Sequence, residues 1–414
     1  MSRRVVVTGL GAVSPVGNNP ETAWENLKAG KSGVVTITRF DVSDLVTKFA
    51  GEIQDFDPAA LFGGKEARRM DRYTQYAMEA SRQAIEGSKI LENGVDRERI
   101  GLAIGSCVGG IDTTMSQYDV LKTRGPSRVN PFAIPMMLPD TAPARIAIDY
   151  GLRGPNMAIV TACATGSNSI GEAFEIIARG AADAMIAGGA EASTNPLIIA
   201  GFNVMKALSE KNDDPAAACR PFELNRDGFV MGEGSVVLLL EELEHAQRRG
   251  AEILAEFIGY GTSVDAYHMA APLEDGAGAA LAMRRAIERA GIEPSDIDYI
   301  NTHGTGTELN DKTETKVIKD VLGEHAYNIK ITSSKSMTGH LFGAAGALEA
   351  LVCVKTLTDG IISPTINYDT PDPECDLDYT PNEARQADVN TALSNSFGLG
   401  GHNATIILKK FSGN

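Results

Sequence analysis

The chain has 414 residues, a formal net charge of −16 and 43% hydrophobic residues, with no uninterrupted apolar stretch longer than Val236–Leu240. This length suffices for one large or two ordinary domains with filled cores. The apolar runs are far too short for a membrane span, and an acidic chain without a basic run is a poor nucleic-acid binder. The five cysteines form no CxxC pair, which argues against a disulfide framework or a zinc site and for a reducing compartment.

The beginning of the chain, Met1–Val7, resembles the start of a signal peptide. However, Thr8–Gly11 breaks the apolar region too early for such a peptide. We therefore interpret Arg4–Thr8 as the first buried strand of a cytoplasmic protein.

Apolar runs of strand length alternate with segments of helical periodicity along the whole chain. The strands predicted before residue 250 are Arg4–Thr8, Ile100–Ser106, Ala158–Ala162, Ala184–Gly188 and Ser235–Leu240, and the helices are Asp71–Ile85, Ser167–Ala178 and Glu242–Arg249. The strands predicted after it are Ile253–Gly259, Asp298–Thr302, Ile329–Ser333, Ala392–Ser396 and Ala404–Lys409, and the helices are Ala279–Ala290, Lys312–Leu322 and Gly343–Leu357. This alternation favours α/β layers with sheets buried on both faces.

A boundary between two halves is predicted near Gly250. The preceding helix, Glu242–Arg249, begins with acid, ends with base and is followed by glycine, as the helix dipole and a left-handed cap favour. We therefore expect one half at residues 1–250 and the other at 251–414. The segments Val160–Ala187 and Ile331–Ile362 are faintly alike, which leaves an internal duplication open.

Cys163 ends a predicted strand and opens a helix of small residues, in the run Thr161–Asn168. A thiol at the positive end of a helix is expected to have a lowered pKa and a larger thiolate fraction. The alternative is an inert core cysteine, the usual state of a free cysteine. We keep that second interpretation for the other four, which are Cys107, Cys219, Cys353 and Cys375.

Two of the six histidines, His303 and His340, directly follow predicted strands and stand in glycine-containing loops. Sites in α/β proteins form beyond the carboxyl ends of strands, so these histidines and Cys163 favour a Cys–His acyl-transfer site. A metal is disfavoured because the three residues lie 140 and 37 positions apart, whereas zinc ligands come in closely spaced pairs. We interpret His245 and His325 as ordinary polar residues, and His268 as a polar loop residue or a contact at the rim of the site.

Two further features have a plain and a functional interpretation. The glycine-rich run Phe397–Asn403 is a tight hairpin or a loop whose N–H groups serve as oxyanion donors. A basic cluster is either a solvated helix start or a patch for an acidic partner. Such a patch can act despite the negative net charge, because charges act locally, over about 8 Å in physiological salt. Its members are Lys65, Arg68, Arg69 and Arg72, joined later in the chain by Arg124 and Arg128.

These motifs resemble the β-ketoacyl-[acyl-carrier-protein] synthases of the thiolase superfamily, and most closely the elongating condensing enzymes of bacterial type II fatty acid synthesis. The resemblance runs from Val5–Gly11 through Arg226–Gly234 to Asn395–Gly398 and so covers nearly the whole chain. It implies a thiolase-like α/β fold with two similar halves in five layers, αβαβα. It also implies a cytoplasmic homodimer that needs no cofactor or metal and takes its substrates from the phosphopantetheine arm of acyl carrier protein.

The resemblance further implies a role for individual residues. Cys163 would be the nucleophile that accepts the acyl chain, and His303 and His340 would assist decarboxylation of the malonyl group. Lys335 and Glu349 would support the histidines, and Thr305 and Thr307 would bind the pantetheine arm. The backbone N–H groups of Cys163 and Leu399 would form the oxyanion hole, and Val108, Phe202 and Leu399 would line the acyl pocket. The implied carrier-protein dock consists of Lys65, Arg68, Arg69, Arg124, Arg128 and Lys206.

Three positions depart from the family pattern. Leu399 replaces the second phenylalanine of the usual FGFGGTN loop, which gates the acyl pocket, and His402 replaces its threonine. Gly306 replaces the serine of HGTST. The acyl length and unsaturation that the site accepts therefore remain open.

Several other functions are weighed against this one. A polyketide ketosynthase and a condensing enzyme for unsaturated chains share the chemistry. A thiolase would pair its nucleophile with a second cysteine where this chain has His340, and a chain-length factor would lack Cys163. A NAD-dependent enzyme would need a third glycine where this chain has Ser14.

Overall fold

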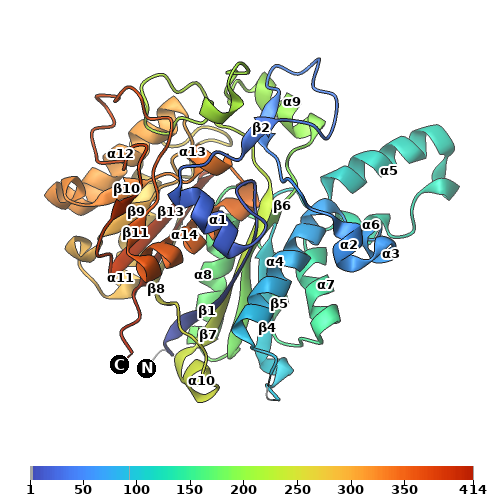
Figure 1. The fold of residues 1–414 in the computed structure, drawn as a ribbon, viewed down its shortest axis with the longest axis horizontal. Helices are drawn as coiled ribbons and strands as arrows, with labels where there is room; N and C mark the ends of the chain where they lie inside the picture. The colour runs from blue at the N-terminus through green and yellow to red at the C-terminus, as the bar shows by residue number, and fades with distance from the viewer. Residues whose placement is uncertain (1–2, 93, 414) are drawn as a thin grey trace.

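The computed structural model describes residues 3–92 and 94–413 (Figure 1), so Met1 and Ser2 of the first interpretation lie outside it. A ten-stranded sheet runs through the molecule. Its strands in the first half of the chain are β1 (Val5–Val13), β4 (Ile100–Gly105), β5 (Asn156–Met157), β6 (Ala184–Glu191) and β7 (Gly234–Glu242). Those in the second half are β8 (Ala255–Val264), β9 (Tyr299–Asn301), β10 (Lys330–Thr332), β13 (Thr391–Gly398) and β14 (His402–Lys409).

The two halves of the sheet repeat one topology. In the middle, β1 pairs antiparallel with β8 through Val5–Val7 and Ala255–Phe257. Outward from β1 come β7 and β6, each antiparallel to the strand before it, and then β4 and β5, each parallel to it. Outward from β8 come β14, β13, β9 and β10 with the same sequence of directions. This repeated order and direction is the pattern that an internal duplication produces.

Helices complete five layers, αβαβα, as the resemblance implies. The middle layer contains α8 (Thr165–Ala178) and α14 (Ala345–Asp359), which pack against each other and against strands of both halves. On the outer faces, α4 (Arg72–Ser88) and α7 (Thr141–Tyr150) cover the first half, and α11 (Ala277–Ala290) and α12 (Glu308–Leu322) cover the second (Figure 1). Both faces of the sheet are therefore covered.

The sequence explains why these elements lie inside. Every residue of β7 is buried, and its run Val236–Leu240 is apolar throughout, as is typical of a strand covered on both faces. Both middle helices are rich in small residues and almost fully buried. Small side chains let the two helices fit between the half-sheets, which places the N-termini of α8 and α14 together near the centre of the molecule.

One predicted strand differs from the structure. Ala158–Ala162 is not a strand, because the pairing on β4 ends with Asn156–Met157 and the chain then turns inward toward α8. Ile361–Ile362 forms β11, which pairs with β12 (Arg385–Gln386) outside the main sheet. In the first half of the chain, β6 is the next strand of the main sheet after α8. Its counterpart in the second half is β13, which follows α14 after an inserted segment. A further small sheet joins β2 (Val34–Thr36) to β3 (Phe49–Gly51).

The helix α7 has no predicted counterpart, and several helices lie outside the layers. They are α1 (Pro20–Lys28), α2 (Pro58–Phe62), α3 (Gly64–Ala67), α5 (Ile111–Arg124), α6 (Ala133–Met137), α9 (Pro196–Val204), α10 (Leu243–Arg248) and α13 (Lys335–Thr338). Of these, α10 coincides with the predicted helix Glu242–Arg249. Within residues 3–92 and 94–413, no helix is both long and apolar enough to cross a bilayer.

Candidate active site

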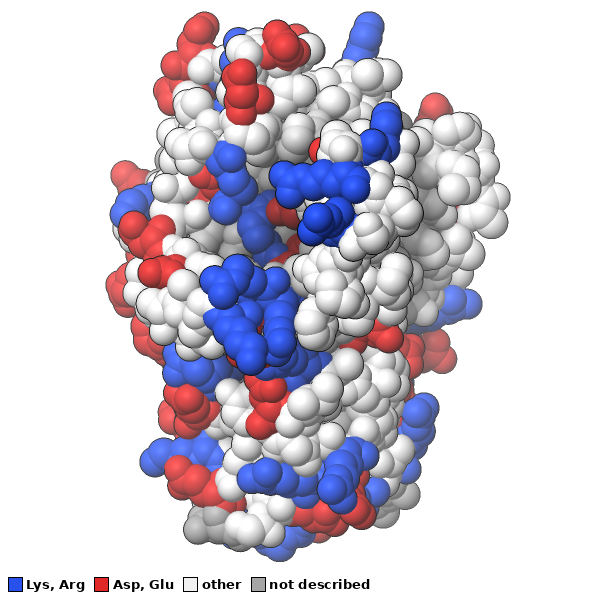
Figure 2. Space-filling view, turned by 90° about the vertical axis from the view of Figure 1, so that its right-hand side faces the viewer, with Lys and Arg blue, Asp and Glu red and all other residues white. Residues whose placement is uncertain are grey.

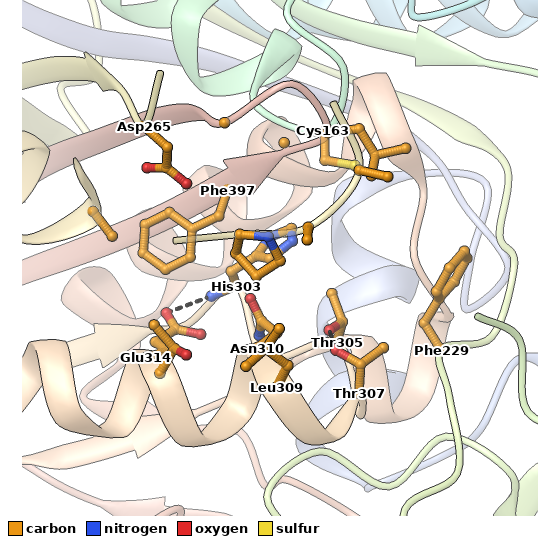
Figure 3. A pocket seen from close by; sticks show the side chains of 18 of the residues that line it. Cys163, Phe229, Asp265, His303, Thr305, Thr307, Leu309, Asn310, Glu314 and Phe397 are labelled. Carbon is orange, nitrogen blue, oxygen red and sulfur yellow. Dashed lines mark hydrogen bonds between the residues drawn. The ribbon is translucent and has the colours of Figure 1, made fainter. Parts of the chain in front are cut away.

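Two cavities meet at Cys163. The first, of about 190 Å³, also contains His303, His340, Thr305 and Thr307 in its wall, and we call it the histidine cavity (Figure 3). The second, of about 330 Å³, has a wall formed almost entirely by apolar side chains, and we call it the apolar cavity. Five residues line both cavities: Cys163, Phe202, Met205, Phe342 and Leu399. A group bound to the sulfur can therefore extend into one cavity while the other stays open.

A tight turn presents Cys163 at the start of α8. Ala162, just before it, has a left-handed φ of 49°, a conformation that costs a residue with a side chain about 1–3 kcal/mol. The turn is tied down by the N–H of Ala164, which donates to the carbonyl of Thr161 at 3.1 Å. Across the cavity, a Cβ on Gly398 would lie only 3.0 Å from the nitrogen of Cys163. Glycine at 398 thus lets the two backbones approach each other beside the sulfur.

The pKa of Cys163 differs from the lowered value that the sequence predicts. The helix start was expected to lower it, but burial raises it to about 11. The backbone N–H of Leu399, which hydrogen-bonds the thiol, and the charge of Lys335 act in the lowering direction without overcoming burial. The thiol is therefore protonated at neutral pH before a substrate arrives. The bond from Leu399 places this N–H at the sulfur, the position expected of an oxyanion donor.

A buried carboxylate of α12 holds the His303 loop. Glu314 accepts the N–H of His303 at 2.9 Å and that of Gly304 at 2.8 Å, and burial raises the pKa of Glu314 to about 7. Burial, and after it the charge of Lys335, lowers the pKa of His303 well below its usual value. The imidazole is therefore neutral at physiological pH and carries an N–H that can be donated.

His340 lies beside His303 in the same cavity. The two ring centroids are 5.2 Å apart at an angle of 84°, and the His340 ring stacks on Phe342 at 4.8 Å. Burial, followed by the charge of Lys335, also lowers the pKa of His340 well below its usual value. Neither ring nitrogen of His340 has a partner within the described residues, and the same holds for Nδ1 of His303. Neutral, unpaired imidazoles are suited to donate hydrogen bonds to a substrate oxygen.

Lys335 and Glu349 form an ion pair behind the histidines. Lys335 lies on α13 just before the His340 loop, and Glu349 lies on α14; both side chains are buried. The structure thus brings together the two supporting residues that the resemblance pairs. The charge of Lys335 is the link to the site, since it lowers the pKa of both histidines.

The predicted pantetheine-binding residues are at the wall of the histidine cavity. The hydroxyls of Thr305 and Thr307 lie 3.0 Å apart, between His303 and the start of α12 (Figure 3). They offer hydrogen-bonding groups on one side of the cavity. The apolar cavity has no such pair among its lining residues.

The predicted acyl-pocket residues Val108, Phe202 and Leu399 all line the apolar cavity. Leu399 lies between the two cavities and is 37% exposed. Cys107, interpreted from the sequence as an inert core cysteine, lines the same cavity as Cys163, and its thiol donates to the carbonyl of Ala162 at 2.9 Å.

The basic residues of the predicted dock face solvent. Lys65 and Arg68 lie at α3, Arg124 and Arg128 lie at the end of α5 and just beyond it, and Lys206 follows α9; all five are exposed. Arg69 is half-buried, with its guanidinium over the ring of Phe132 at 4.7 Å. Figure 2 views the side where α3 and α5 lie and shows Lys and Arg side chains gathered across the middle of that face. Arg72 is separate, since it is bound to Asp112 and Glu233 inside the molecule.

Three other histidines lie outside the walls of the two cavities. His245 contacts Glu241, His325 contacts the carbonyl of Ile297, and Nδ1 of His268 accepts backbone N–H groups within its own loop. Sequence reasoning missed Glu314 and Glu191, whose carboxylates hold loops of the site. The only available signal for Glu314 was an acidic residue on the predicted helix Lys312–Leu322, whereas Glu191 lies beyond the end of the predicted strand Ala184–Gly188 and had no signal.

The chain is similar to known proteins over its whole length. Residues 2–246 match the family model "Beta-ketoacyl synthase, N-terminal domain", and residues 254–369 match "Beta-ketoacyl synthase, C-terminal domain". The chain is 52% identical over 410 residues to "3-oxoacyl-[acyl-carrier-protein] synthase 2" of Staphylococcus aureus (strain N315), covering 99% of both chains. It is 51% identical over 409 residues to the protein of the same name from Synechocystis sp., covering 99% of this chain and 98% of that one.

A solved structure shares the fold over the full length of the chain. It is described as a type II PKS acyl-carrier protein in complex with its ketosynthase bound to the hexaketide, and it has a TM-score of 0.91 at 36% identity, with 100% of both chains covered.

Proposed function

The chain belongs to the β-ketoacyl synthase family, and from that premise we propose how its residues divide the work of the reaction. The protein is an acyltransferase of the 3-oxoacyl-[acyl-carrier-protein] synthase 2 type. It catalyses the elongating condensation of fatty acid synthesis, in which an acyl chain and malonyl-acyl-carrier-protein yield CO₂ and a 3-oxoacyl chain longer by two carbons.

In the first half-reaction, the sulfur of Cys163 attacks the thioester of the acyl-carrier-protein. The tetrahedral oxyanion accepts hydrogen bonds from the backbone N–H groups of Cys163 and Leu399. The carrier thiol leaves with a proton, and the acyl chain stays on the sulfur and extends into the apolar cavity. The observation that carries this assignment is the meeting of two cavities at one thiol, with imidazoles in only one of them.

In the second half-reaction, malonyl-acyl-carrier-protein enters the histidine cavity with its arm on Thr305 and Thr307. Loss of CO₂ leaves negative charge on the thioester oxygen, and the neutral imidazoles of His303 and His340 stabilise it by donating N–H bonds. The resulting carbanion attacks the acyl-cysteine, which releases the Cys163 thiolate and forms the carbon–carbon bond. Lys335 supports this step because its charge, added to the larger effect of burial, lowers the pKa of both imidazoles and so helps keep them neutral.

Acyl carrier protein is the proposed partner at the basic face (Figure 2). The exposed cations Lys65, Arg68, Arg124, Arg128 and Lys206, together with Arg69, provide positive charge on a chain whose net charge is −16. Local attraction of an acidic partner survives that net charge because screening confines fields to about 8 Å in physiological salt. The related solved ketosynthase is likewise in complex with an acyl-carrier protein.

A homodimer in the cytoplasm is the proposed state of the chain. The edge strand β5 is only two residues long, and the chain after it exposes Val160 at 53%. Nearby on α7, Ile148 is 75% exposed, and on α9, which lines the apolar cavity, Val204 is 84% exposed. A second copy would cover these apolar side chains and close the outer end of the apolar cavity. The free thiols of all five cysteines suit a reducing compartment.

Mass spectrometry of the products tests the proposal. The purified protein would be mixed with malonyl-acyl-carrier-protein and with acyl-carrier-proteins of increasing chain length, saturated and cis-unsaturated. We expect extension by two carbons, and its loss of at least about a thousandfold in Cys163→Ala, while malonyl decarboxylation persists. Cys353→Ala, which removes a buried thiol outside both cavities, is the matched control.

Two results would overturn the proposal. Unimpaired condensation by Cys163→Ala would remove the nucleophile assignment. No extension of any fatty acyl chain by the folded wild-type protein would instead favour a polyketide substrate. A Leu399→Phe variant in the same assay would show which chain lengths the smaller residue admits.

A further inference from the structure

We propose that Arg226 is a positioning residue for the carrier arm, and that the segment Arg226–Gly232 joins the arm-binding loop to His340. This inference rests on the proposed function, since it concerns how the arm is held during both half-reactions. The segment belongs to the motif Arg226–Gly234, which the mechanism above leaves without a role.

One end of the segment holds the loop that carries Thr305 and Thr307. The Arg226 guanidinium is buried, with a side chain only 2% exposed. Its Nε donates to the carbonyl of Thr307 at 3.4 Å, and its Nη2 donates to the carbonyl of Glu308 at 3.3 Å. The backbone N–H of Gly228 adds a bond to the carbonyl of Gly306 at 3.2 Å. Three consecutive carbonyls of the loop thus face donors from this segment.

Acidic partners fix the guanidinium in turn. Nη1 of Arg226 donates to Asp372 at 2.7 Å, and Nε lies 3.5 Å from the carboxylate of Asp311. Asp311 also accepts the N–H of Gly306 at 3.3 Å. The guanidinium and its counter-ion therefore bind the same loop, one through its carbonyls and the other through an N–H. A lysine has a single point of charge in place of the planar fork and cannot make these contacts together.

The other end of the segment holds His340. The N–H of His340 donates to the carbonyl of Val230 at 2.7 Å, and the carbonyl of His340 accepts the N–H of Gly232 at 2.9 Å. Between these contacts, the ring of Phe229 meets the His340 ring edge-on, with centroids 5.8 Å apart. Figure 3 shows Phe229 on the same side of the cavity as Thr305 and Thr307. A few residues thus set the distance between the arm-binding hydroxyls and the imidazole.

Arg226→Lys tests the inference, because Cys163 reacts both with a substrate that is carried on the arm and with a small reagent that is not. Acyl transfer from acyl-carrier-protein to Cys163 uses the arm, whereas alkylation of Cys163 by iodoacetamide does not. We expect the KM of acyl transfer to rise about tenfold with kcat changed less than about threefold, as loss of uniform binding predicts. The alkylation rate should stay within about twofold of wild type.

Arg249→Lys is the matched control. Arg249 is also a largely buried arginine, bound to Glu241 at 2.6 and 2.7 Å and to the carbonyl of Ser88 at 2.7 Å, but it lies outside both cavities. Its substitution should leave both rates within about twofold of wild type, since it affects folding alone.

A double-mutant cycle separates positioning from a general structural effect. If Arg226 acts through the Thr307 loop, Arg226→Lys and Thr307→Ala together should raise KM by clearly less than the product of their single effects. The inference is overturned if Arg226→Lys leaves KM unchanged, if acyl transfer and alkylation fall equally, or if the two substitutions multiply. A wild-type protein that forms no acyl-enzyme would overturn the proposed function itself, and this inference with it.

Discussion

At Cys163 two physical effects oppose each other, and the structure shows which one is larger. The start of α8 and the N–H of Leu399 favour the thiolate, whereas burial among Phe202, Phe342 and their neighbours favours the thiol. Burial prevails and raises the pKa to about 11. The same burial lowers the pKa of His303 and His340. The resting site is therefore electrically neutral at these three residues, and charge arises only as the reaction proceeds.

The pH dependence of alkylation follows from this pKa. Because the folded-state pKa of Cys163 is about 11, the thiolate fraction should rise about tenfold for each pH unit between 7 and 9.5. The rate of iodoacetamide modification should rise in parallel, measured as mass gain on the peptide that contains Cys163. The Cys163→Ala protein provides the background. A plateau above pH 8 would instead indicate the lowered pKa that the sequence predicts.

At the scale of elements, the site is built from strand ends that occupy equivalent places in the two halves. The chain after β5 leads to Cys163 and α8, and the chain after β10 leads to Lys335, His340 and α14. In the same way Cys107 follows β4, and His303 follows β9. The repeated topology therefore brings four loops to one point, and the two halves differ in the residues that these loops carry.

Much of this architecture could be predicted from the sequence. The buried strands and the helices α4, α8, α11, α12 and α14 have unambiguous apolar patterns. The glycine-containing loops after strands made His303 and His340 candidates, and the helix start made Cys163 one; the structure brings the three together at one cavity. Edge elements such as β5 could not be predicted, because their pattern depends on what covers them. Glu191 could not be predicted either, since its role depends on backbone N–H groups brought from distant parts of the chain.

Glu191 connects two loops of the site, and its loss should lower the free energy of unfolding. Its buried carboxylate accepts Ser106 Oγ at 2.8 Å and the N–H groups of Cys107, Val108 and Gly343 at 2.7, 3.3 and 3.1 Å. It thereby joins the loop after β4 to the turn that carries Phe342, at the wall of the apolar cavity.

Glu191→Gln should weaken both the fold and acyl transfer. An amide has one acceptor oxygen and turns an NH₂ group toward N–H donors, so the free energy of unfolding should fall by about 2–4 kcal/mol. The loss would be read as a lower thermal midpoint, and transfer of long acyl chains should slow more than that of short ones. Glu175→Gln alters a half-exposed ion pair with Arg289 and should change neither the thermal midpoint nor the rate of acyl transfer. An unchanged midpoint in Glu191→Gln would contradict this account.

At the scale of the whole molecule, the sheet ends at β5 with apolar side chains beyond it, while the cations of the proposed dock other than Lys206 gather at α3 and at the end of α5. The first feature suits a permanent apolar contact with a second copy, and the second suits a transient partner that must leave after each transfer. The two kinds of surface thus match the two proposed partners, the second copy and the carrier protein.

A charge at the proposed dimer surface should separate the subunits. Val160→Glu places a carboxylate where an apolar contact is proposed, and the two-fold axis would bring its counterpart close as well. Light scattering should give the mass of two chains for the wild type and of one chain for Val160→Glu at micromolar concentration. Leu224→Glu, at an apolar residue that is 49% exposed, should keep the mass of two chains. A single-chain mass for the wild type would exclude the homodimer.

The meeting of two cavities at one sulfur also determines the timing of events. Of the two cavities, the histidine cavity has the threonine pair proposed to hold the pantetheine arm. Under the proposed mechanism, the donor of the acyl chain and the donor of the two-carbon unit therefore use the same entrance in turn. The first carrier has to depart before the second can dock, and the protein must retain the growing chain through that interval. An excess of malonyl-acyl-carrier-protein will then occupy the free enzyme, and an excess of acyl-acyl-carrier-protein will occupy the acyl-enzyme. The pace of elongation therefore depends on the ratio of the two carriers as much as on their amounts.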